Sequence, residues 1–210
     1  MKKLTKSNLE ELAKVMPVLS EEEQKEYVGG DLIYMNRAGQ IMDRTIQDGA
    51  DVICFEAPEG ELTGARYTMP KDYRLESYSY DITDSSGTVT GQGQGVVFKK
   101  YGSSGNNMEM FETFVENTDV EWGLSNNKSN GNAALFSSHN HTELQNFYEQ
   151  GTQFDSSIHS HPCVSEVEDE PYESLDDLGA RERDKKRGFT DFQVYIKSEK
   201  EYVPYTKTLF

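Results

Sequence analysis

Two histidines separated by one residue, His159 and His161, have the type and spacing that best fit metal chemistry. They lie in the segment SSIHSHP (156–162), whose alternation predicts a strand that Pro162 ends. Residues i and i+2 of a strand project from the same face, so both imidazoles can reach one ion while Ile158 packs the other way. Catalytic zinc takes three protein ligands and keeps one position open. We therefore predict a zinc centre on this strand.

A hydrolytic zinc centre also needs a third ligand and a carboxylate that takes a proton from the attacking water. Asp177 is the candidate ligand, because it lies in the first turn of a helix predicted over 174–187 and capped by Ser174. Glu121, at the start of a strand predicted over 120–126, is the candidate general base. The pattern therefore requires one helix and two strands to bring these groups together.

These motifs together resemble those of the JAMM/JAB (MPN) zinc metalloproteases. The similar segments are EWGL (121–124), HSHP (159–162) and S-x-x-D (174–177), and in character they are nearest to the JAB-like domains of bacterial secreted toxins. The resemblance covers roughly residues 100–210, including the order of the elements. It implies an α+β fold: a JAMM-like (cytidine-deaminase-like) mixed sheet flanked by helices, preceded by a small β-rich region and an N-terminal helical leader.

The resemblance also implies a role for each matching residue and a reaction. Glu121 would be the general base and Ser174 would stabilise the oxyanion, while the zinc ligands would be His159, His161 and Asp177. The reaction would be hydrolysis of a peptide or isopeptide bond in a protein or peptide substrate.

One spacing departs from the family pattern. The family serine usually follows the second histidine by eight residues, and position 169 of this chain is Asp. Five extra residues within the acidic loop SEVEDEPYES (165–174) account for the difference, and a longer surface loop costs little entropy. Asp176 stays open as an alternative third ligand.

Other interpretations of these residues stay open. His139 and His141 form a second His-x-His pair, which would face solvent, line the substrate cleft or hold the metal in a cupin-like or four-His site. Ser174 and Asp177 also fit a helix cap without any metal. The alternative function is a non-catalytic secreted protein, bacteriocin-like or binding, that retains the fold.

Residues 1–30 differ in character from the rest of the chain. They predict helical structure with an apolar stripe of Leu9, Leu12, Val15 and Met16, and they end at Gly29-Gly30. A helical hairpin with a flexible turn is one interpretation. The segment also resembles the double-glycine leaders of bacteriocin-type proteins, which an ABC transporter with a peptidase domain cleaves after the second glycine. That resemblance implies a secreted chain that begins at Asp31, and the toxin resemblance adds an immunity protein as a partner.

The remaining sequence predicts the elements that would position the site. We expect a leader over 1–30, a β-rich region over 31–100 and a metallopeptidase domain over 101–210. Short strands are predicted over 32–35, 40–46 and 51–57, and a helix over 107–117. The stretch GTVTGQGQGVVF (87–98) lacks the strand–turn–helix context of a phosphate-binding loop and predicts a hairpin.

Composition excludes several classes of function. The 210 residues carry 21 Lys and Arg against 37 Asp and Glu, a formal net charge of −16, which is unsuited to binding nucleic-acid phosphates. No apolar run is long enough to span a bilayer, so we expect no membrane insertion. Two cysteines exclude a disulfide framework.

Overall fold

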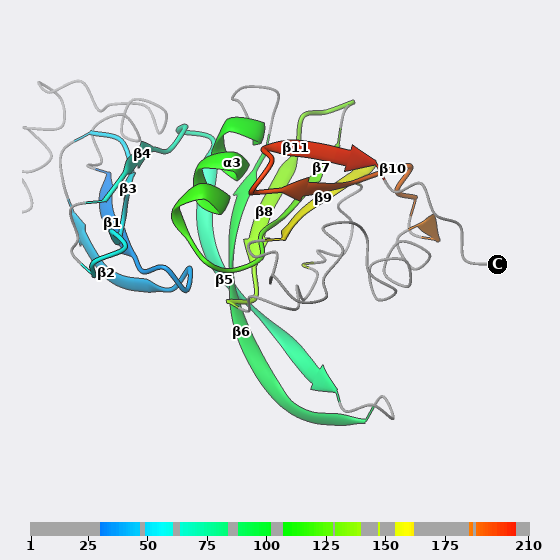
Figure 1. Cartoon of the computed structure of the whole chain (residues 1–210), viewed down its shortest axis with the longest axis horizontal. Helices are drawn as coiled ribbons and strands as arrows, with labels where there is room; N and C mark the ends of the chain where they lie inside the picture. Colours follow the sequence, from blue (N-terminus) through cyan, green and yellow to red (C-terminus); the bar gives the residue numbers. More distant parts are fainter. Residues whose placement is uncertain are drawn as a thin grey trace, which may run out of the picture.

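A helix packed between two β-sheets organises the part of the chain that the structure describes (Figure 1). The computed structural model describes residues 30–46, 49–60, 64–83, 88–101, 107–127, 129–139, 147, 154–161, 185–186 and 188–204. Eleven strands and the helix α3 (Asn107–Asn117) lie within these ranges. None of the described residues forms a helix long and apolar enough to cross a membrane.

The smaller sheet has four strands in the order β2-β1-β3-β4. Its strands are β1 (Asp31–Met35), β2 (Ile41–Ile46), β3 (Val52–Phe55) and β4 (Arg66–Thr68). β1 and β3 are parallel, and the other pairs are antiparallel. The strands expected in this region from aromatic and β-branched residues between glycine turns are therefore confirmed.

The larger sheet has seven strands in the order β11-β10-β9-β7-β8-β6-β5. Its strands are β5 (Tyr73–Thr83), β6 (Val89–Lys100), β7 (Gly123–Asn126), β8 (Ala133–Ser137), β9 (Ser156–His161), β10 (Asp191–Ile196) and β11 (Glu201–Pro204). Only the β9–β10 pair is parallel. The strand that carries the two histidines thus lies inside the sheet, between β10 and β7.

The expected α+β fold, a mixed sheet flanked by helices, is wrong. The described residues are mostly β, with two mixed sheets and the single helix α3. The physical reason is that strands cover the second apolar side of α3: Ile33 and Met35 of β1 and Ile53 and Phe55 of β3 join its core. The helices expected over 1–30 and over 174–187 lie outside the described residues, apart from residues 30, 185 and 186.

The helix expected over 107–117 is confirmed with the same bounds. Its buried residues are Met110, Phe111, Phe114 and Val115. The ring of Phe114 lies 5.1 Å from Phe55, 4.9 Å from Phe98 and 4.8 Å from Trp122, all in edge-to-face arrangements. One side chain of α3 therefore contacts both sheets.

The hairpin expected within the glycine-rich stretch 87–98 is not formed there: this stretch lies in the single strand β6, which pairs antiparallel with β5. The far end of the β5–β6 pair extends beyond the neighbouring strands (Figure 1). Tyr80 pairs with Gly93, and Tyr78 pairs with Gly95. A Cβ on Gly93 would lie 2.3 Å from the Tyr80 ring, and one on Gly95 would lie 2.5 Å from the Tyr78 ring. Gly93 and Gly95 leave space for the rings of Tyr80 and Tyr78. Because successive residues of a strand point to opposite faces, these glycines occur at every second position of β6.

Phe114→Ala should destabilise the protein by about 3–5 kcal/mol, because it opens a cavity where both sheets meet α3. Val89→Ala is the control, since Val89 is 54% exposed and should change stability by no more than about 0.5 kcal/mol. Urea unfolding followed by circular dichroism measures both. Equal effects of the two substitutions would contradict the packing of α3 between the sheets.

Candidate metal centre

The two histidines of β9 point their imidazole tips at each other. The Nε2 atoms of His159 and His161 are 3.0 Å apart, and the ring centroids are 4.9 Å apart. Burial alternates along β9, with Ser156, Ile158 and Ser160 buried and the residues between them half-buried. Ile158 packs into the core on the other face, as the sequence predicts.

This separation of nitrogens suits either a shared proton or a shared metal ion. The Nε2–H of one ring can donate a hydrogen bond to the Nε2 of the other. In that case one ring carries a proton on Nε2 and the other ring does not. Alternatively, two nitrogens that each bind zinc at about 2.0–2.1 Å in tetrahedral geometry lie about 3.3 Å apart. The observed distance of 3.0 Å is close to that value. The two histidines could therefore bind one zinc ion without a movement of the β9 backbone.

The strand expected over 120–126 begins at Gly123 in the structure, as β7, so Glu121 lies two residues before it. Gly123 of β7 is directly opposite His159, and the Trp122 carbonyl accepts a 2.9 Å hydrogen bond from the Ser160 backbone N–H. Continuing this register by one residue places Glu121 opposite His161, and directly opposed residues of antiparallel strands share a face. Glu121 is 8% exposed. The candidate base and the histidine pair therefore lie on one face of the sheet.

That face is the one turned away from α3. Phe136 is also directly opposite Gly123, so it shares the face of His159. Phe136 packs in a second apolar cluster, separate from the core of α3, with Phe147, Phe154 and Phe192. Apolar neighbours lower the local dielectric, which strengthens interactions between a metal ion, its ligands and a nearby carboxylate.

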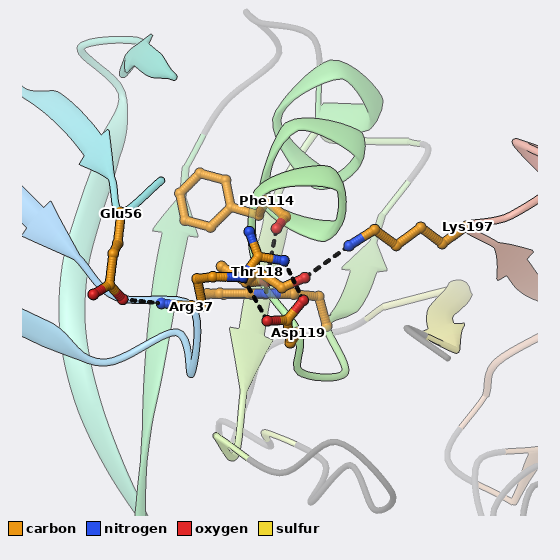
Figure 2. Close-up of polar contacts among 7 residues, drawn as sticks. Arg37, Glu56, Phe114, Thr118, Asp119 and Lys197 are labelled. Atoms are coloured by element: carbon orange, nitrogen blue, oxygen red, sulfur yellow. Dashed lines mark hydrogen bonds and ion pairs between the residues drawn. The ribbon is translucent and has the colours of Figure 1, made fainter. Parts of the chain in front are cut away.

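Contacts on both sides hold the segment that carries Glu121. The Arg37 side chain pairs with Asp119, the Asp119 N–H donates to the Arg37 carbonyl at 2.7 Å, and the Lys197 ammonium donates to the Thr118 carbonyl at 2.8 Å (Figure 2). The Ser137 hydroxyl donates to the carbonyl of Glu121 at 2.7 Å. The turn after β1, strand β8 and the β10–β11 turn thus all contact this segment, which is the loop after α3.

Ser160 is a positioning residue that sequence reasoning did not identify. It is fully buried, and its Oγ accepts a 3.0 Å hydrogen bond from the Trp122 N–H. The Trp122 indole N–H in turn donates to Thr118 Oγ1 at 2.8 Å. Ser160 therefore aligns β9 with the segment that holds Glu121. Its position two residues after the inward-facing Ile158 is the only signal that the sequence offers.

Several residues of the expected site lie outside the described part of the chain. These are Ser174, Asp176 and Asp177, together with His141 and Gly29. Among the residues that are described, no three His, Cys, Asp or Glu side chains come together as a metal-binding group. His139 therefore does not complete the His159–His161 pair. A third ligand would come from the undescribed part, where Asp177 and Asp176 lie.

His139 packs against the turn between β1 and β2 instead of facing solvent. Its Nδ1 is buried without a hydrogen-bond partner and lies close to Gly39. Burial lowers the pKa of His139, and a hydrogen bond with the backbone of Ala38 opposes that shift. Its φ of 60° is in the left-handed region. His139 thus belongs to the contact between the two sheets.

No protein-family model, curated protein or solved structure matches this chain. Its function is therefore inferred from its own residues and their geometry.

Ser160→Ala should destabilise the protein by about 1–3 kcal/mol, because it leaves the buried Trp122 N–H without its acceptor. Ser157→Ala, the same change at a half-buried position of β9, is the matched control and should have a much smaller effect. Urea unfolding measures both. If Ser160→Ala is as stable as Ser157→Ala, the hydrogen bond does not align the strands.

Acidification should destabilise the protein through His139. The pKa of His139 in the folded state lies below its usual value of about 6.5, so the unfolded chain binds the proton first. The stabilisation of the folded state by neutral His139 is present above about pH 6.5 and is lost as the pH falls below this value. His139→Asn, which tolerates the positive φ, should remove this part of the pH dependence. Thermal unfolding between pH 5 and 7.5 tests it, and an unchanged slope would contradict it.

Proposed function

We propose that this chain is an exported zinc-dependent peptidase or isopeptidase that acts as a toxin or effector. The observation that carries the proposal is the convergence of His159 and His161, whose Nε2 atoms lie 3.0 Å apart. The strand next to them, β7, follows the segment that carries Glu121. Support comes from these residues and not from any likeness of fold. The net charge of −16 further favours a protein or peptide substrate over a nucleic acid.

Each residue of the proposed site has a separate task. His159, His161 and Asp177 would hold zinc, which supplies a Lewis acid that polarises a carbonyl and lowers the pKa of water. Glu121 accepts the proton of the attacking water and delivers it to the leaving amine. Ser174 donates a hydrogen bond to the oxyanion that forms on the substrate carbonyl carbon.

The export route belongs to the same proposal. An ABC transporter with a peptidase domain would recognise the apolar stripe of residues 1–30 and cleave after Gly30. The exported chain would then begin at Asp31, the first residue of β1. A toxin of this kind also requires an immunity protein in the producing cell.

Zinc content tests the proposed centre directly. The purified protein should bind about one zinc ion per chain, measured by mass spectrometry of the metal. His161→Ala should lose this zinc, because two remaining ligands rarely hold the ion. His139→Ala is the matched control and should retain it. A zinc content that stays the same in all three proteins would contradict the assignment of the ligands.

Hydrolysis is then tested on a library of proteome-derived peptides, with the products identified by mass spectrometry. Glu121→Gln should retain zinc but lose cleavage, since an amide keeps the shape and accepts no proton. Ser174→Ala should retain zinc and slow cleavage by roughly 10²- to 10³-fold. Glu201→Gln, at an exposed position of β11, is the control. Zinc binding without cleavage in the unaltered protein would favour the non-catalytic binding protein.

A further inference from the structure

The junction between Gly30 and Asp31 is tightly packed against the start of β3. Gly30 is buried, and a Cβ on it would lie 2.3 Å from the carbonyl carbon of Ala50 and 2.5 Å from its oxygen. Contacts this short with backbone atoms leave no room for any other residue at position 30. The second glycine therefore has a packing role in the folded chain.

The backbone nitrogen on the other side of this peptide bond already contacts a carboxylate. The Asp31 N–H donates to Oδ1 of Asp51 at 2.7 Å. The carboxylate of Asp31 itself pairs with the guanidinium of Arg44 on β2. Two carboxylates and one cation thus meet at the first residue of β1.

We infer that Asp51 is the built-in acceptor for a new N-terminus at Asp31. Hydrolysis of the Gly30–Asp31 peptide bond adds one water: Gly30 gains a carboxylate and leaves with residues 1–29, and Asp31 gains an ammonium group. The ammonium replaces a neutral N–H donor at the same place, so its bond to Asp51 becomes charge-assisted. It also supplies a second cation for the two carboxylates. This inference rests on the leader cleavage proposed above.

The same packing determines when cleavage takes place. A peptidase must bind the residues around the bond in an accessible, extended form, and in the folded chain Gly30 is buried against Ala50. Cleavage therefore precedes the docking of β1 on β3, as in a chain that is exported unfolded. Once β1 has docked, the uncleaved bond is shielded.

The pKa of the α-amino group of Asp31 tests the inference. A chain from Asp31 can be released from an N-terminal fusion by a protease that leaves no extra residue, and all described strands and α3 lie within it. The pH dependence of acylation of its α-amine, read by mass spectrometry, should give a pKa about 1 unit or more above the usual 7.7–8.0. Asp51→Asn should return it to that range, and Asp81→Asn, an exposed position of β5, should not.

Thermal unfolding provides a second measurement that includes the full chain. Asp51→Asn should lower the Tm of the chain from Asp31 more than that of the full chain, in which the donor is a neutral N–H. An ordinary α-amino pKa, equal losses of Tm in the two chains, or a chain from Asp31 that does not fold would each overturn the inference. Exported protein that retains residues 1–30 would instead overturn the proposed leader, so the two failures are distinguishable.

Discussion

Burial of α3 between the two sheets is the constraint on which the other features depend. The Phe114 ring contacts Phe55 of the small sheet, Phe98 of the large sheet and Trp122, which directly precedes β7. A helix of this length is marginal alone, so its stability comes from the apolar surface it covers. Because strands cover it on both sides, the described region needs no second helix to complete its core. This explains why a mostly β arrangement surrounds a strongly amphipathic helix.

The position of α3 in turn determines the geometry on the opposite face of the large sheet. The chain leaves the helix through Thr118, whose hydroxyl oxygen accepts the Trp122 indole N–H, and Trp122 pairs with the backbone and side chain of Ser160. Residues on either side of Trp122 and Ser160 project the other way. The packing on the α3 face of the large sheet therefore positions the segments that carry Glu121, His159 and His161. The proposed chemistry depends on this core, although the core residues do not contact the substrate.

The small sheet connects this region with the start of the chain. Its turn after β1 pairs Arg37 with Asp119 next to the candidate base, while the first residue of β1 meets Asp51. Proteolytic release of residues 1–30 would change charge at one end of β1, and the other end supports the segment before Glu121. The proposed cleavage site and the segment before the candidate base thus contact opposite ends of one strand, β1.

The sequence by itself determined the features that depend on local backbone periodicity. The spacing of apolar and polar residues predicts the bounds of α3, the short strands after residue 30 and the shared face of His159 and His161. The tertiary structure alone decided which surfaces cover α3, and this is why the helix-flanked α+β expectation is wrong. It also decided the pairing of Ser160 with Trp122, the tyrosine rings over Gly93 and Gly95, and the contact of Asp31 with Asp51. These contacts join residues far apart in the chain, and their partners carry no local pattern that could identify them.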